Sequence, residues 1–378
     1  MRVLFWVCLL GAMYSYFLYP LLLCLFPKRV RSPAGSGTGN ELPLMSFIIT
    51  AHNEESLIEE KLKNTLALDY PIERLEVLVA SDASTDDTDD IVRSYKTKGV
   101  RLVRADKHFG KEYAQSLAVK AANGEILVFS DAATEVPQDA LRNLANAFSD
   151  PSVGAVSSVD RFVTDSGRIV GEGLYVRYEM WLRGLESRLA GLIGLSGSFF
   201  AARKSVCENW DIVSPSDFNT ALNCARKGFV AISSPAVVGI YKDIKDERRE
   251  YKRKVRTVVR GMTAIARQPS VLNPFHFGFF AFEVWSHKLM RWAVPWFLVG
   301  LLMASIALVG RHWFFTFALA GQVAVYIVVA AAWMSPTVRH NALARLAFFF
   351  IQVNFAITHA TLAFLSGKRI TTWKPSER

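Results

Sequence analysis

Three apolar, β-rich runs in the first part of the chain each end in polar or acidic residues. They occupy 46–55, 78–82 and 126–131. Such a run is typical of a strand buried in a parallel sheet, because helices cover both of its faces. In an open α/β sheet, ligands bind beyond the carboxyl ends of the strands. The sequence therefore predicts a mostly parallel sheet whose acidic edge binds a polar ligand.

Helical patterns alternate with these runs, which predicts right-handed βαβ crossovers. We expect strands at 44–51, 75–80, 100–104 and 126–130. The expected helices are 54–67, one that ends near 98, 111–123 and 138–148. Asn53 is placed to be the N-cap of the first of them.

Four uncharged stretches lie near the two ends of the chain, at 3–26, 292–310, 313–338 and 346–367. Each can cross a bilayer, since about 20 apolar residues span the hydrocarbon. A signal peptide is the alternative for the first stretch. That reading fits poorly, because no small-residue cleavage site follows and basic residues come next. We expect three or four spans, with 346–367 the most polar.

These patterns divide the chain into six parts. They are an N-terminal transmembrane anchor at 1–27, a linker at 28–43, an α/β domain at 44–270, an interfacial amphipathic helix at 271–291, a transmembrane region at 292–367 and a basic tail at 368–378. A buried helix of the α/β domain is the alternative for the interfacial helix. Either way, most of the charge falls in the α/β domain.

The net charge is +10. Lys and Arg are enriched in cytoplasmic segments beside membrane spans, and basic residues follow the first stretch directly. This predicts a multi-pass membrane protein whose α/β domain is cytoplasmic, at a bacterial inner membrane. The basic tail favours the same side, which conflicts with four spans. Nucleic acid is excluded as a partner, because no recognised reading module accompanies the charge.

Several motifs, in this order, resemble those of family 2 glycosyltransferases with a GT-A (Rossmann-like) domain. Residues 48–55 resemble that family's first strand and acidic turn, 81–88 its "SDGSTDGT" segment, and 129–134 its Asp-x-Asp element. The resemblance runs over about 45–265. Residues 287–295 resemble the membrane entry of members that make exopolysaccharides.

The resemblance implies a nucleotide-sugar donor, UDP-linked, at the strand ends. Asp82 would contact the base, and Thr50, Ala51 and Glu54 would line the uridine pocket. A carboxylate in a helix first turn is the alternative for Glu54. Lys111 resembles a Gly-Lys that meets the diphosphate at a helix start; a surface lysine is its alternative.

Asp131 is the expected ligand of a divalent cation, Mg²⁺ or Mn²⁺, since both suit hard oxygen donors. Here the chain departs from the family pattern. Ala133 stands where the second Asp would be, and Ala is no ligand. Either Glu135 or the oxygens of the substrate complete the site, or metal binding is weakened.

The acceptor side is expected at two later segments. Gly197 lies in a small-residue segment that resembles one near the acceptor site, with a plain β-turn as the alternative. Asp217 resembles the family's general base in an inverting transfer. Ser216 replaces the family's preceding Glu. A helix N-cap is the alternative role for Ser216 or Asp217.

Arg253 and Arg256 lie where the family has Gln-x-x-Arg-Trp, which grips diphosphate and acceptor. Arginine suits bidentate contact with phosphate. A basic helix facing lipid heads is the alternative. Thr257 replaces the Trp, which argues against long-chain processivity.

The sequence thus predicts a membrane-bound inverting glycosyltransferase. Its expected partners are a nucleotide sugar, a saccharide or lipid-linked acceptor, the bilayer, and an export or assembly protein that supplies a channel. Polysaccharide synthesis and addition of one sugar to a lipid carrier both remain open. The alternative from another class is a non-catalytic scaffold subunit that keeps the fold.

Overall fold

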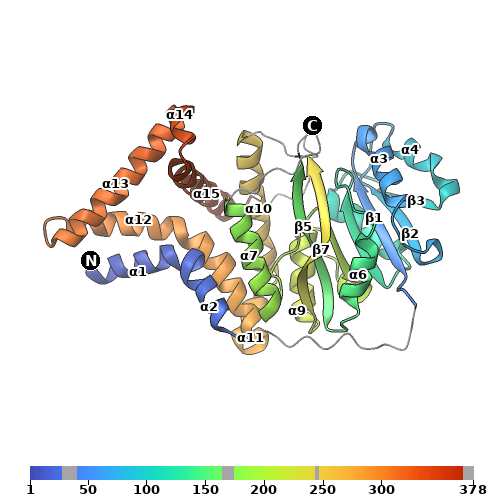
Figure 1. Cartoon of the computed structure of the whole chain (residues 1–378), viewed down its shortest axis with the longest axis horizontal. Coiled ribbons are helices and arrows are strands. Elements are labelled where there is room, and N and C mark those ends of the chain that lie inside the picture. The colour runs from blue at the N-terminus through green and yellow to red at the C-terminus, as the bar shows by residue number, and fades with distance from the viewer. Residues whose placement is uncertain (28–40, 164–173, 243–246, 369–378) are drawn as a thin grey trace. The chain divides into compact units, whose positions relative to one another are not determined.

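In a computed structural model the chain forms two compact units (Figure 1). The structure describes residues 1–27, 41–163, 174–242 and 247–368. The α/β unit comprises the described residues within 26–244 and 263–281, and the helical unit comprises those within 1–25, 245–262 and 282–369. The predicted linker lies outside the described residues up to position 40, as does the basic tail beyond Lys368.

A seven-stranded sheet forms the centre of the α/β unit, in the order β3-β2-β1-β4-β6-β5-β7. The strands are β1 (Met45–Ala51), β2 (Leu75–Ser81), β3 (Val100–Arg104), β4 (Ile126–Asp131), β5 (Val153–Val163), β6 (Phe199–Arg203) and β7 (Val230–Lys242). Only β6 runs antiparallel to its neighbours β4 and β5. The other pairs are parallel, so the prediction of a mostly parallel α/β sheet is confirmed.

Helices flank this sheet on both faces. They are α3 (Glu55–Leu66), α4 (Thr88–Ser94), α5 (Lys111–Ala121), α6 (Ala140–Phe148), α7 (Leu174–Leu189), α8 (Lys204–Cys207) and α9 (Ser216–Arg226). Alternate residues of β1 enter different cores: Phe47 and Ile49 pack in one cluster and Ile48 in the other. Because both faces of β1 are buried, its apolar residues do not alternate with polar ones.

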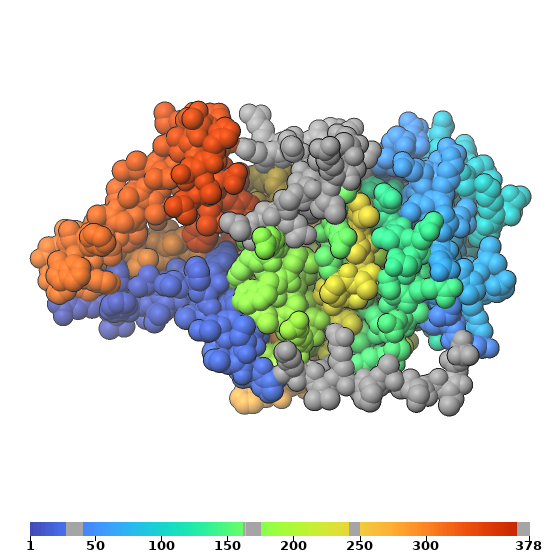
Figure 2. Space-filling view, in the orientation of Figure 1, coloured from blue at the N-terminus to red at the C-terminus, as the bar shows by residue number. Residues whose placement is uncertain are grey.

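The register brings the carboxyl ends of three strands to one level. Thr50 of β1 pairs with Ala80 of β2 on one side and with Asp131 of β4 on the other. The residues that follow these strands therefore share one edge of the sheet, as the sequence predicts. β7 is an edge strand, and Figure 2 shows it, in yellow, at the surface between α6 (green) and α7 (lime).

One local prediction is wrong. Asn53 does not cap α3, because its φ is 54° and the N-cap position falls on Glu54. Asn53 instead takes the left-handed conformation that Asn tolerates better than most residues. The turn after β1 therefore contains a residue with positive φ.

The helical unit contains apolar helices. They are α1 (Arg2–Met13), a π-helical turn (Tyr14–Leu18), α2 (Tyr19–Leu25), α12 (Met290–Leu308), α13 (Trp313–Met334), α14 (Pro336–Arg339) and α15 (Ala342–Leu365). α1 lies along α12, where glycines allow close approach. A Cβ on Gly11 would lie 2.8 Å from the Phe297 ring, and one on Gly300 would lie 2.7 Å from Sγ of Cys8.

Among the described residues, four helical stretches are long and apolar enough to cross a membrane: Arg2–Leu25, Pro274–Leu308, Trp313–Met334 and Ala342–Leu365. The second includes α11 (Pro274–Glu283), a π-helical turn (Val284–Leu289) and α12. The interfacial helix predicted at 271–291 thus forms the start of a longer candidate span, and its interfacial position stays a prediction. α10 (Glu247–Arg267) precedes it, and both units contain part of α10.

Candidate functional site

The motif 81–88 holds the acidic turn after β1 in place. The side chains of Ser84 and Thr88 accept hydrogen bonds from the backbone N–H groups of Asn53 (3.2 Å) and Glu54 (2.8 Å). Asp86 accepts from the N–H of Glu55 at 3.1 Å. These side chains take up amides at the start of α3 that the helix itself cannot satisfy. The motif therefore acts first as a structural clamp on the turn that carries Glu54.

The carboxylate of Asp82 accepts hydrogen bonds from its own chain. Its carboxylate is 1% exposed and accepts from the N–H groups of Phe109 (3.0 Å) and Gly110 (2.8 Å). Nδ1 of His108 lies 2.8 Å from Oδ2. Gly110 has φ 101°, a conformation that favours glycine and turns this peptide toward Asp82. Contact between Asp82 and a base, as predicted, would require the 106–110 loop to move.

Two imidazoles meet beside Asp82, and the sequence analysis did not single them out. The rings of His52 and His108 stack with centroids 4.0 Å apart. Nδ1 of His52 lies 2.7 Å from the backbone oxygen of Asp82. One ligand atom from each of the three residues lies within 4.8 Å of the others, so the group could hold a metal ion. Two imidazoles and one carboxylate suit Zn²⁺ better than Mg²⁺.

Thr50 and Ala51 are buried at the end of β1. Oγ1 of Thr50 accepts from the amide of Gln115 at 3.1 Å, and the Ala51 carbonyl accepts from the N–H of Asp82 at 2.9 Å. The side chain of Glu54 is also buried. These three predicted pocket residues are thus adjacent to Asp82, and their contact with uridine stays a prediction.

Lys111, Asp131 and Gly197 come together from three distant segments. Nζ of Lys111 lies 2.5 Å from Oδ1 of Asp131 and 2.7 Å from the carbonyl oxygen of Gly197. The lysine side chain is 8% exposed and that of Asp131 is 27% exposed. The surface-lysine alternative is therefore wrong. The buried ammonium group of Lys111, at the start of α5, therefore lies beside Asp131 at the end of β4.

Asp131 offers one partly exposed carboxylate to a divalent cation. Ala133 has no ligand atom, and Lys111 already pairs with Asp131. Mg²⁺ is commonly held by one or two carboxylates together with phosphate oxygens of the substrate. The residues present therefore fit Mg²⁺ or Mn²⁺ only when a substrate completes the coordination.

Two residues of α3 hold the segment that contains Ala133. Nζ of Lys61 donates to the carbonyl oxygen of Thr134 at 2.5 Å. The side-chain amide of Asn64 donates to the Val136 carbonyl (2.9 Å) and accepts from its N–H (3.0 Å). Burial lowers the pKa of Lys61 to about 7, although the charges of Asp131 and Glu135 oppose this shift. The sequence analysis did not single out Lys61. Its position on the apolar face of a predicted helix was the signal that could have indicated a buried lysine.

Gly197 lies against Asp217. A Cβ placed on Gly197 would be 3.2 Å from Oδ2 of Asp217, so a larger residue would crowd the carboxylate. Leu195 N–H also donates to the Asp217 backbone oxygen at 3.3 Å. Helix α9 starts at Ser216, its N-cap is Pro215, and no side chain caps it. The N-cap alternative is therefore wrong for Ser216 and Asp217. In the described part of the chain, the Asp217 carboxylate has no hydrogen bond or ion pair.

Arg253 and Arg256 lie on the part of α10 that belongs to the helical unit. The guanidinium of Arg253 is exposed and pairs with Glu250 at 2.7 Å. Arg256 is half-buried. Their predicted contact with the diphosphate stays a prediction.

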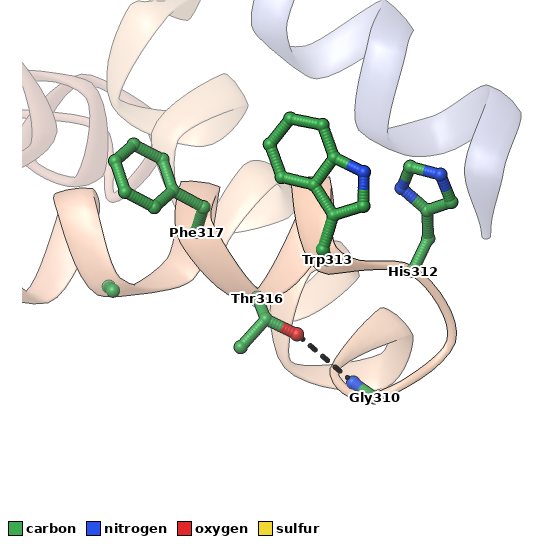
Figure 3. Close-up of a pocket in the computed structure, with 6 residues that line it drawn as sticks. Gly310, His312, Trp313, Thr316 and Phe317 are labelled. Atoms are coloured by element: carbon green, nitrogen blue, oxygen red, sulfur yellow. Dashed lines mark hydrogen bonds between the residues drawn. The ribbon is translucent and has the colours of Figure 1, made fainter.

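A pocket in the helical unit contains none of these residues. Figure 3 shows its lining at the turn between α12 and α13: Gly310, His312, Trp313, Thr316, Phe317 and Ala320. Oγ1 of Thr316 accepts from the N–H of Gly310 at 3.2 Å and closes the turn. No residue of this lining carries a carboxylate, and we assign it no part in the chemistry.

Comparison with known proteins identifies the α/β unit. Residues 46–210 match the family model described as Glycosyl transferase family 2. Over these residues the predicted resemblance to family 2 glycosyltransferases is confirmed. Mannosyltransferase PcManGT from Pyrobaculum calidifontis, solved with GDP-Man and Mn²⁺, matches with a TM-score of 0.71 at 24% identity. The match covers 97% of this chain and 99% of that one, which supports the GT-A fold.

Two curated relatives are each 29% identical. One is the probable glycosyltransferase YdaM of Bacillus subtilis (strain 168), over 45% of this chain and 44% of that protein. The other is the poly-beta-1,6-N-acetyl-D-glucosamine synthase of Staphylococcus aureus (strain COL), over 46% of this chain and 43% of that protein. The match thus spans less than half of each relative's length.

Proposed function

We propose that the protein is a membrane-bound, inverting glycosyltransferase. It moves a sugar from a nucleotide sugar, UDP-linked, to a saccharide or lipid-linked acceptor in the synthesis of a cell-surface polysaccharide or glycolipid. One observation carries this proposal. Lys111, Asp131 and Gly197 meet beside the carboxylate of Asp217, which has no hydrogen bond or ion pair among the described residues. A buried cation and an unengaged carboxylate are the two groups that such a transfer needs.

Each group has a defined task in a single displacement. The Lys111 ammonium stabilises the negative charge that grows on the leaving diphosphate, and the positive end of the α5 helix dipole lies beside it. Asp217 accepts the proton of the attacking hydroxyl as that oxygen bonds to the anomeric carbon. Because the hydroxyl attacks in a single displacement, from the side opposite the leaving diphosphate, the anomeric configuration inverts. A divalent ion at Asp131, when bound, would neutralise further diphosphate charge.

The membrane role rests on the four candidate spans. We place the α/β domain on the cytoplasmic side of a bacterial inner membrane, because nucleotide sugars are made in the cytoplasm. A relative named for poly-N-acetylglucosamine synthesis makes an N-acetylglucosamine donor the first to test. The GDP-Man bound to the structural neighbour makes GDP-mannose the second.

The test is release of nucleoside diphosphate by the full chain in detergent. A panel of UDP- and GDP-linked sugars is assayed with Mg²⁺, with Mn²⁺ and with a chelator, beside Asp217→Asn. Release that requires one donor and Asp217 supports the proposal. Binding of the nucleotide without release from any donor contradicts it. That result would favour a scaffold subunit, the alternative to which Ala133, Ser216 and Thr257 point.

A further inference from the structure

A polar cluster surrounds Asp160, a residue that belongs to none of the motifs discussed so far. Ser158 and Ser196 both donate to its Oδ1, at 2.9 and 2.6 Å. The hydroxyls of Ser196 and Ser198 are 3.0 Å apart, and Ser198 donates to the Tyr241 hydroxyl at 3.2 Å. Four hydroxyls thus gather around one carboxylate, and we call these five residues the Asp160 cluster.

The Asp160 cluster adjoins the proposed reaction centre through the backbone. Ser196 and Ser198 flank Gly197, whose carbonyl accepts from Lys111. The carbonyl of Ser198 accepts from the N–H of Asp131 at 3.0 Å. In the 195–198 segment, the side chains of Ser196 and Ser198 thus belong to the Asp160 cluster. The backbone carbonyls of Gly197 and Ser198 accept hydrogen bonds from Lys111 and Asp131.

A second connection fixes the far side of the cluster. Glu135, four residues after Asp131, forms two backbone hydrogen bonds of 2.9 Å with Ile240, the residue before Tyr241. A Cβ on Gly239 would lie 3.2 Å from Phe199 and 3.5 Å from Oγ of Ser158. The strand ends are thus packed closely enough to hold the cluster beside the site.

The chemistry of the cluster suits an uncharged polyhydroxyl ligand. Ser158 and Ser196 are buried, whereas Asp160, Ser198 and Tyr241 are partly exposed. Burial and the charge of Asp160 raise the pKa of the Tyr241 hydroxyl, so it stays protonated. Hydroxyls that both donate and accept, around a carboxylate that accepts, match the hydroxyls of a sugar. The same carboxylate repels phosphate, which distinguishes this cluster from the diphosphate end.

We propose that the Asp160 cluster binds the ring hydroxyls of a pyranose in a substrate saccharide, beside Gly197. This inference rests on the proposed function and adds to it the residues that select the sugar. Both the donor sugar and the acceptor sugar present such hydroxyls, and kinetics separates the two.

Saturation-transfer NMR on the full chain in detergent tests the inference without turnover. The probes are the methyl glycosides of N-acetylglucosamine, glucose, galactose and mannose. We expect Asp160→Asn to weaken binding of at least one glycoside about tenfold, the size of a lost hydrogen bond to a charged group. UDP affinity and the melting temperature should be unchanged. Asp69→Asn, an exposed carboxylate paired with Arg142, is the matched control.

Equal glycoside binding by Asp160→Asn and the native chain would overturn the inference, as would no binding to either. If Asp160→Asn lowers the melting temperature, Tyr241→Phe decides by the same comparison. With an active donor, a raised KM for the donor alone assigns the cluster to the donor sugar, and one for the acceptor alone assigns it to the acceptor. Turnover that is unchanged in Asp160→Asn, with unchanged glycoside binding, would contradict this inference only. Glycoside binding without turnover from any donor would contradict the proposed function only.

Discussion

Asp82 and Asp217 are both carboxylates beside the same sheet edge, yet their surroundings differ. Asp82 is 1% exposed and is held by two backbone amides and His108. Asp217 is partly exposed, and its carboxylate has no hydrogen-bond partner among the residues that the structure describes. A carboxylate whose lone pairs are taken by its own chain anchors a loop, whereas one without partners can accept a proton.

The Lys111–Asp131 pair stands between these two extremes. Its ammonium group is buried, yet a fraction of the carboxylate remains accessible. A buried charge of this kind costs free energy unless it is paired. The pairing therefore offsets the cost of burying the Lys111 ammonium group, and in the proposed function it holds this cation where the diphosphate binds. In the proposed function, internal contacts preform the donor half of the site, and the acceptor half is left open.

Asp217→Asn should give the largest loss of turnover. The amide cannot take the proton of the acceptor, and general base catalysis typically contributes about 10²–10⁴-fold. We expect turnover to fall within that range while the melting temperature stays constant, because no hydrogen bond of the side chain is lost. Diphosphate release measures the first, and differential scanning fluorimetry the second. Asp87→Asn, an exposed residue at the start of α4, should change neither.

Lys111→Met should give the next largest loss, about 10²-fold, the typical cost of removing one group that stabilises developing charge. The variant also leaves Asp131 without its ammonium partner, so added Mg²⁺ or Mn²⁺ should bind more tightly than in the native chain. Initial rates across a metal titration measure both effects. Lys107→Met is the control, since Lys107 is exposed and belongs to the same loop. A loss no greater than that of the control would contradict a role for Lys111 at the diphosphate.

Asp82→Asn should act mainly on stability. The amide group would face the N–H groups of Phe109 and Gly110, which leaves at least one buried donor unsatisfied at a cost of about 1–3 kcal/mol. We expect a lower melting temperature and faster proteolysis in the 106–110 loop. Unchanged stability, together with lost nucleotide affinity, would show instead that Asp82 serves the ligand rather than the loop.

Lys61→Met should have the smallest effect on turnover and should change how stability depends on pH. The pKa of Lys61 is lowered to about 7 in the folded chain, and an unfolded lysine titrates near 10.4. Between these values the unfolded state binds more protons, so the stability of the native chain should rise with pH, by at most about 1.4 kcal/mol per unit. Below pH 7 both states are protonated, and the cost of burying the charge is fully present.

Melting temperatures from pH 6 to 10 measure this effect. The Lys61→Met curve should lack the rise above pH 7, because Met does not titrate. Lys63→Met, at an exposed position on the same helix, should keep it. Parallel curves for the native chain and Lys61→Met would contradict the buried, partly neutral lysine.

The sequence predicts β1, β2 and β4 and the acidic residues that follow them, because burial on both faces leaves a continuous apolar run. It also predicts β3, but not β5, β6 or β7. It fails where segments far apart in the chain meet. Three contacts depend on such tertiary proximity. They are the stacking of His52 on His108, the hydrogen bonds from Lys61 and Asn64 to the 134–136 segment, and the Asp160 cluster. Asn53 was misplaced for a local reason, since capping residues also occupy tight turns with positive φ.

Family motifs likewise identify residues but not their surroundings. The motif around Asp82 suggests a ligand contact. The structure shows that two backbone amides and the imidazole of His108 already contact its carboxylate. The motif around Asp217 suggests a base, with an N-cap as the alternative. Only the helix start at Ser216 excludes the cap.

The most direct test of this division between the two halves is the affinity of UDP for three forms of the full chain: native, Lys111→Met and Asp217→Asn. Isothermal titration calorimetry in detergent, with and without Mn²⁺, gives the three dissociation constants. We expect Lys111→Met to bind UDP about tenfold or more weakly, since it loses a charge-assisted contact. Asp217→Asn should bind UDP as the native chain does, although it no longer turns over. Equal weakening by both variants would contradict the account, because Asp217 would then belong to the donor half.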